Sequence, residues 1–187
     1  AASRIRALYH LLESPTPPIV IAAAETLLQK VVPKQEIIKY AELLIAGEEI
    51  DRERLIEKLI AGGYTHAAIV EEPGDFCVRG GILDIYCPLY PDPMRIEFFG
   101  DIAESIRFFS AASQRTVQSI SEAVILPARE MILEKALLPQ TINRFRSRAA
   151  ELEMPLTEIR RIIDSVKNGQ RFKGMENLMS LVFPELD

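Results

Sequence analysis

Two short stretches near the middle of the chain place arginines, acids and an aromatic residue at alternating positions. In the first, Arg79 and Asp84 flank a pair of glycines, and in the second, Arg95, Glu97 and Phe99 occupy every other position. A guanidinium group grips a carboxylate through two parallel hydrogen bonds, and arginine and aromatic residues are enriched at protein interfaces. This pattern favours recognition of another protein over catalysis.

The pair Gly80-Gly81 predicts a two-residue hairpin turn, because glycine takes a positive φ without a Cβ clash. This turn would pair Arg79 with Ile82, Val78 with Leu83, Cys77 with Asp84 and Phe76 with Ile85. Paired residues of an antiparallel ladder point to the same side of the sheet. One side is then a core face made of Phe76, Val78, Leu83 and Ile85. The other is a mixed outer face made of Cys77, Arg79, Ile82, Asp84 and Tyr86.

A second strand is predicted from alternation along residues 94–99. It would bury Met94, Ile96 and Phe98 and turn Arg95, Glu97 and Phe99 outward. A charged strand face is commonly only solvated surface, and that reading stays open beside the binding face. The sequence has no lysine between Lys58 and Lys135, and lysine-poor, arginine-rich composition favours the interface.

The elements that must position these residues are predicted from apolar periodicity and from Gly and Pro breaks. Helices are expected at residues 4–13, 25–30, 36–39, 52–61, 140–151, 156–168 and 175–182. Further strands are expected at residues 18–23, 40–46, 64–71, 104–109 and 119–126. The continuous apolar run 18–23 is typical of a strand buried on both sides, and its neighbours do not supply covering layers. With an opening Ala-Ala-Ser and no initiator Met, the chain is expected to be a fragment of a larger α/β protein.

Composition narrows the classes of function. The 187 residues carry a net charge of −5, which argues against a broad surface that neutralises phosphates. Phosphate-loop, HExxH, paired CxxC and GxSxG motifs are absent from the sequence, so we expect no catalytic residue, metal ligand or cofactor site in this chain. Cys77 and Cys87 fall on opposite faces of the predicted hairpin, so free thiols and a reducing compartment are expected.

The central sequence also contains an ordered series of motifs over some fifty residues. They are EPGDF at 72–76, VRGGILDI at 78–85, RIEFFGD at 95–101, ESIR at 104–107 and SQRT at 113–116, flanked by PIVIAAAETLLQK at 18–30 and PARE at 127–130. This series resembles a module shared by the excision repair subunit UvrB and the bacterial transcription-repair coupling factors (Mfd). The Arg-Gly-Gly-Ile-Leu-Asp turn and the Glu-Pro-Gly lead-in favour the N-terminal UvrB-homology region of the coupling factors.

The resemblance implies a mixed α/β fold (α+β), in which a small, strand-rich module like UvrB domain 2 is inserted into a partial, degenerate helicase-like α/β domain. Residues 1–44 would end the first part of that domain. Residues 45–127 would be the UvrA-binding module, and residues 128–187 would begin the second, helical part of the domain.

The resemblance also implies function. The module would recruit UvrA by mimicking UvrB in nucleotide excision repair, with Arg79, Arg95 and Phe99 as contacts and Glu97 as a fourth. Replacing either arginine by alanine is expected to weaken UvrA binding and to leave folding intact. The whole protein would be a cytoplasmic ATP-dependent DNA translocase that engages RNA polymerase and DNA through other regions, with no membrane partner. The alternative is a DNA-handling helicase-like domain of a UvrB-type repair subunit.

Overall fold

A computed structural model describes residues 2–16, 18–27, 30–170, 172 and 174–183. The chain divides into two units. Residues 1–19 and 34–130 form the first unit, which contains all the strands of the described chain. Residues 20–33 and 131–187 form the second unit, whose described elements are helical. The predicted mixed α/β class is therefore confirmed.

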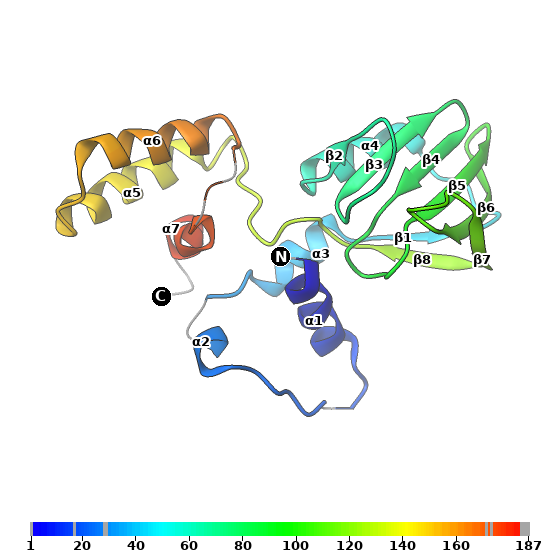
Figure 1. Ribbon diagram of the computed structural model, residues 1–187, viewed down its shortest axis with the longest axis horizontal. Coiled ribbons are helices and arrows are strands. Elements are labelled where there is room, and N and C mark those ends of the chain that lie inside the picture. The colour runs from blue at the N-terminus through cyan, green and yellow to red at the C-terminus, as the bar shows by residue number, and fades with distance from the viewer. Residues whose placement is uncertain (1, 17, 28–29, 171, 173, 184–187) are drawn as a thin grey trace. The chain divides into compact units, whose positions relative to one another are not determined.

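The first unit is built around a sheet of six strands in sequence order (Figure 1). These strands are β2 (Thr65–His66), β3 (Asp75–Arg79), β4 (Ile82–Ile85), β5 (Met94–Phe99), β6 (Ile102–Phe109) and β7 (Thr116–Ile120). The β2–β3 pair is parallel and the other neighbours are antiparallel. The β3–β4 register pairs Arg79 with Ile82 and Phe76 with Ile85, as the Gly-Gly turn predicts.

The two turn glycines serve different purposes. Gly80 has a φ of +57°, in the left-handed region that glycine enters without strain. Gly81 is needed for space instead, because a Cβ at this position would lie 2.9 Å from the carbonyl oxygen of Phe98. The backbone N–H of Phe98 donates to the Gly81 carbonyl at 2.7 Å, which ties the end of β5 to the hairpin turn.

Smaller elements complete the first unit. They are α1 (Ala2–Glu13), α3 (Lys34–Tyr40), α4 (Arg52–Ala61) and a two-stranded sheet of β1 (Glu42–Ile45) and β8 (Glu122–Ile125). Asp51 caps the N-terminus of α4, because its Oδ1 accepts from the Arg54 backbone N–H at 2.9 Å. Leu55 and Leu59 on α4 are buried, as are the sheet residues Phe76, Leu83, Ile85, Met94 and Ile96.

The opposite side of the sheet is not the open face that alternation predicts. Cys77 and Asp84 are buried there, and Cys77 packs with Val70 and Phe109, with Tyr86 against them. The loop between β2 and β3 supplies Val70, and the end of β6 supplies Phe109, which is remote from the hairpin in sequence. The face therefore carries a small second core beside its charged residues.

The second unit contains α2 (Ala24–Leu27), α5 (Leu138–Glu151), α6 (Leu156–Lys167), the 3-10 helix η1 (Met175–Leu178) and α7 (Met179–Val182). Ile162, Ile163 and Val166 of α6 are buried. Arg144 of α5 donates from Nη1 to the Leu181 carbonyl at 3.0 Å, linking α5 to α7.

Several predicted elements are wrong. Residues 18–23 form no strand in the described chain, and Ile19 and Ile21 are 94% and 95% exposed, since no strand pairs with them. Of the strand expected at 64–71, only the two residues of β2 are in a strand. The single strand expected at 119–126 is divided between β7 and β8. The single helix expected at 175–182 is divided between η1 and α7. Of the helix expected at 25–30, residues 28 and 29 lie outside the described residues.

Candidate functional site

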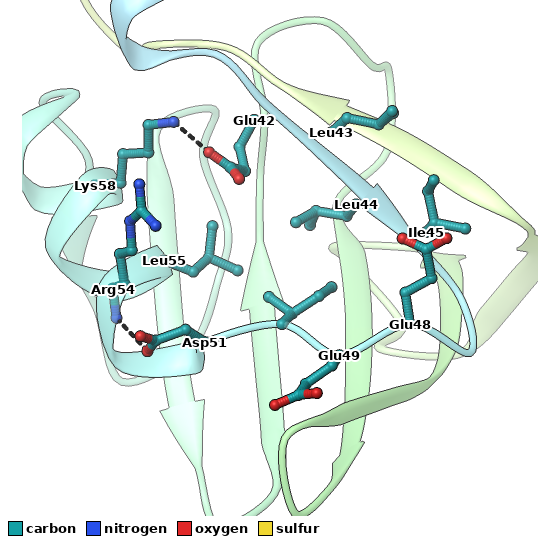
Figure 2. Close-up of a pocket in the computed structure, with 11 residues that line it drawn as sticks. Glu42, Leu43, Leu44, Ile45, Glu48, Glu49, Asp51, Arg54, Leu55 and Lys58 are labelled. Carbon is teal, nitrogen blue, oxygen red and sulfur yellow. Dashed lines mark hydrogen bonds and ion pairs between the residues drawn. The ribbon is translucent and has the colours of Figure 1, made fainter.

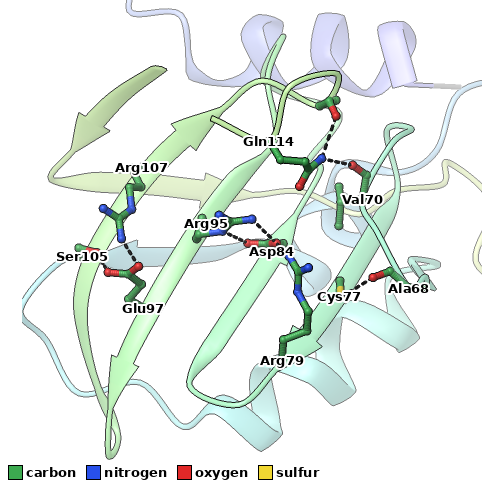
Figure 3. Close-up of polar contacts among 11 residues, drawn as sticks. Ala68, Val70, Cys77, Arg79, Asp84, Arg95, Glu97, Ser105, Arg107 and Gln114 are labelled. Atoms are coloured by element: carbon green, nitrogen blue, oxygen red, sulfur yellow. Dashed lines mark hydrogen bonds and ion pairs between the residues drawn. The ribbon is translucent and has the colours of Figure 1, made fainter. Parts of the chain in front are cut away.

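Asp84 lies at the centre of the candidate site, with a side chain only 1% exposed (Figure 3). Arg95 grips this carboxylate with two nitrogens, since its Nε donates to Oδ1 at 2.7 Å and its Nη2 donates to Oδ2 at 2.8 Å. Arg79 adds a third bond from Nη2 to Oδ2 at 2.7 Å. Two of the predicted contact residues are therefore joined through one buried acid.

The strand register explains this arrangement. Asp84 is directly opposite Cys77 on β3 and directly opposite Arg95 on β5, so the acid sits on the strand between the two arginines. Arg79 is opposite Ile82, which makes it a diagonal neighbour of Asp84 within reach of a long side chain. Because all three alternate onto one side, the sheet itself brings their charged groups together.

The two arginines differ in how firmly they are held. The Arg95 side chain is 20% exposed, and its guanidinium carbon lies 4.6 Å from the centroid of the Phe109 ring. Its hydrogen bonds to Asp84 raise the pKa of Arg95 above the ordinary value, and partial burial only partly offsets this. Arg79 is 48% exposed and makes its single described contact with Asp84. Arg79 therefore has N–H donors that its contact with Asp84 does not use.

Glu97 belongs to a neighbouring pair and not to the arginine cluster. It forms an ion pair with Arg107 of β6, and its Oε2 accepts from Ser105 Oγ at 3.1 Å (Figure 3). Glu97 is opposite Ser105 and Arg95 is opposite Arg107, so these four residues lie side by side on β5 and β6. Glu97 is thus next to the cluster but already has a cationic partner.

Phe99 ends β5 and is 75% exposed. It is opposite Ile102, another exposed apolar residue, across the tight turn at Gly100 and Asp101. Since the Phe98 N–H bonds to Gly81, this end of β5 lies beside the hairpin turn that follows Arg79. The fold therefore brings an exposed ring to the same end of the sheet as the more exposed arginine.

Sequence reasoning placed Asp84 on this side of the hairpin but did not include it among the contact residues. The signal that identifies it is the strand register, because the Gly-Gly turn sets Asp84 opposite Cys77 and the β4–β5 pairing sets it opposite Arg95. Arg107, the partner of Glu97, belongs to the motif ESIR at 104–107 and is not among the predicted contact residues. Its pairing with β5 depends on a β-bulge register in β6 that no local pattern reveals.

A separate concavity of about 210 Å³ lies between β1, α4 and the segment that joins them (Figure 2). It is smaller than the roughly 300 Å³ at which small-molecule pockets begin. Three of its charged residues already have roles, since Glu42 pairs with Lys58 and Asp51 caps α4. In the described parts of the chain no group of three or more potential metal ligands is found, and no helix there has the length and apolarity to span a membrane.

Comparison with known proteins assigns the segment that holds this cluster. Residues 43–131 match the family described as the UvrB interaction domain. Over this segment, which includes the six-stranded sheet, the chain is similar to that family. All of the site residues, from Arg79 to Arg107, lie inside this segment.

The chain is also similar to transcription-repair-coupling factors from several bacteria. It is 36% identical to that of Myxococcus xanthus over 182 residues, which is 97% of this chain and 15% of the relative. It is 31% identical to that of Escherichia coli strain K12 over 186 residues (98% of this chain, 16% of the relative), and 35% identical to that of Bacillus subtilis over 130 residues (67% and 11%). The predicted relationship to the coupling factors is confirmed. The chain spans only about 15% of the length of the first of these relatives.

Proposed function

We propose that this segment is a UvrB interaction domain that recruits UvrA, as part of a transcription-repair coupling factor that mimics UvrB in nucleotide excision repair. Arg79, Arg95 and Phe99 make the contacts, and Glu97 lies at their edge. The observation that carries the proposal is a half-exposed guanidinium, fixed on a buried acid, at the same end of the sheet as an exposed phenylalanine. Such a combination is what interface hot spots contain.

The energetics support a protein partner. Arg79 is already oriented by Asp84, so less side-chain entropy is lost when a partner carboxylate or carbonyl binds it. The exposed ring of Phe99 and the exposed side chain of Ile102 offer apolar area that a partner would bury. A rigid polar anchor beside an apolar one gives both orientation and affinity.

The test is titration calorimetry of the chain against purified UvrA, with wild type, Arg79→Ala and Phe99→Ala compared. Each substitution is expected to cost roughly 1–3 kcal/mol of binding free energy, which is about fivefold to 150-fold in Kd. Wild-type affinity in both variants would refute the assignment.

DNA handling is the competing function, and the site disfavours it. Arg79 and Arg95 share the Asp84 carboxylate and Arg107 pairs with Glu97, so two of these three positive charges are offset before any phosphate approaches. Duplex DNA should therefore bind weakly. Strong DNA binding that weakens steeply with salt, as phosphate contacts do, would favour the helicase-like function over UvrA recruitment.

We further propose that the flanking residues belong to the helicase-like domain of a larger ATP-dependent translocase that engages RNA polymerase and DNA elsewhere. Residues 20–33 and 131–187 group in one unit although the UvrB interaction domain separates them in sequence. This grouping supports a module inserted into another domain. The exposed Ile19 and Ile21 are explained if further parts of that domain cover them. Expression of a longer chain should protect these residues from hydrogen exchange.

A further inference from the structure

The burial of Asp84 is unusual for a charged residue. An ionised carboxylate removed from water is costly unless it is fully paired, and apolar residues of similar volume are often the more stable choice. Here both carboxylate oxygens accept hydrogen bonds, one from Arg95 alone and one from Arg95 and Arg79 together. The arrangement satisfies the acid, and it also fixes two long side chains in one orientation.

Asp84 cannot itself reach a partner, because its side chain is covered by the two arginines and the sheet. Any influence of this acid on binding must pass through Arg79 and Arg95. A bidentate contact fixes the plane of the Arg95 guanidinium, and the shared Oδ2 places the Arg79 guanidinium next to it. Both groups are then ordered before binding, which lowers the entropy lost when a partner docks.

We propose that Asp84 is a positioning residue for partner recognition, and that its carboxylate holds Arg79 and Arg95 in the orientation that UvrA binds. The inference rests on the proposed function. It assigns the role of orientation to a residue that makes no contact with the partner. The other charged groups on this side, Glu97 and Arg107, form their own pair and do not replace it.

The test is a double-mutant cycle with Asp84→Asn, Arg79→Ala and Arg95→Ala, read by calorimetry against UvrA. Asparagine keeps the shape but loses the charge and one acceptor, so binding should weaken about tenfold. If the acid acts through the arginines, Asp84→Asn should cause no further loss when both arginines are already alanine. An effect of Asp84 that does not pass through the arginines would weaken binding by the same factor in both backgrounds, and that result would overturn the inference.

Two outcomes separate this inference from the proposed function. If Arg79→Ala weakens UvrA binding and Asp84→Asn does not, the positioning role is lost while UvrA binding at this site stands. If neither Arg79→Ala nor Phe99→Ala changes the affinity, the proposed function fails and the inference fails with it.

A measurement on the wild-type protein covers the case in which Asp84→Asn does not fold. NMR relaxation of the Arg79 Nε–H in the free chain should report an ordered guanidinium despite its exposure. Order parameters below about 0.6, typical of a flexible group, would show that Asp84 does not hold Arg79 and would overturn the proposal. The exposed Arg146 of α5 is the reference for a mobile side chain.

Discussion

The guanidinium of Arg95 lies over the ring of Phe109, with 4.6 Å between the guanidinium carbon and the ring centroid. Phe109 is fully buried with Val70 and Cys77, so Arg95 covers a small core while it also pairs with Asp84. Arg79 has no such second role. Two arginines that look equivalent in the sequence are therefore expected to contribute differently to stability.

Arg95→Ala should destabilise the fold, contrary to the expectation from the sequence that neither arginine matters for folding. It removes two of the three hydrogen bonds on a buried carboxylate, which should cost roughly 2–4 kcal/mol of the free energy of unfolding. Arg79→Ala leaves the bidentate Arg95 contact in place and should cost less than about 1 kcal/mol. Urea unfolding of both variants measures these free energies. Equal losses of stability in Arg95→Ala and Arg79→Ala would contradict the conclusion that only Arg95 supports the fold.

Phe99→Ala should separate binding from stability. Because the ring is exposed at the end of β5, its loss should change the free energy of unfolding by no more than about 0.5 kcal/mol. The same substitution should weaken UvrA binding. Val117→Ala on β7 is the matched control, since Val117 is also an exposed apolar residue of the same sheet and lies outside the proposed contacts. Equal loss of binding in both variants would point to general surface hydrophobicity and not to Phe99.

The turn offers a test of the two glycine roles. Gly81→Ala should cost roughly 1–3 kcal/mol of stability, because its Cβ would press on the Phe98 carbonyl and strain the bond between them. Gly80→Ala meets no atom within 4 Å and should cost only the roughly 1 kcal/mol of a left-handed alanine. Thermal unfolding of the two variants compares them. A larger loss at Gly80 would show that backbone conformation, and not space, limits this turn.

Local patterns were sufficient for the hairpin but not for the whole charged cluster. A two-residue turn fixes the β3–β4 register and places Arg79 and Asp84 on one side, whereas the β4–β5 register that sets Asp84 opposite Arg95 spans the loop at 88–93 and was not predicted. The burial of that side was not predictable from the hairpin alone, because Phe109 comes from the far end of β6. For the same reason the local pattern could not separate the role of Arg95 from that of Arg79.

The strand predicted at residues 18–23 failed for a related reason. A continuous apolar run indicates burial on both sides, but pairing partners are needed to make it a strand. In the described chain this segment has none, and its apolar side chains are exposed. The apolar composition of this segment favours a buried strand, but a strand forms only where a neighbouring strand pairs with it.

The last prediction concerns alkaline pH and a buried group of hydrogen bonds beneath β8. Tyr64 donates to the Leu126 carbonyl at 2.6 Å, and the Leu126 N–H donates to Cys87 Sγ at 3.3 Å. Burial raises the pKa of Cys87 above its ordinary value of 9.0 and raises the pKa of Tyr64 well above 10.0. Both groups are therefore neutral in the folded protein, and they ionise more readily when it unfolds.

For groups whose pKa is raised on folding, the stabilisation is complete below the unfolded pKa and is lost as pH rises beyond it. The free energy of unfolding should thus be constant to about pH 8.5 and then fall, with a slope of up to about 1.4 kcal/mol per pH unit for each group. Cys87→Ala removes the first titration and should delay the fall to near pH 10, where Tyr64 begins to ionise in the unfolded chain. Urea unfolding of wild type and Cys87→Ala between pH 7.5 and 10.5 measures both onsets. If Cys87 stays neutral in the folded protein, the wild type should begin to lose stability at a lower pH than Cys87→Ala. Coincident curves would therefore show that Cys87 does not control stability at alkaline pH.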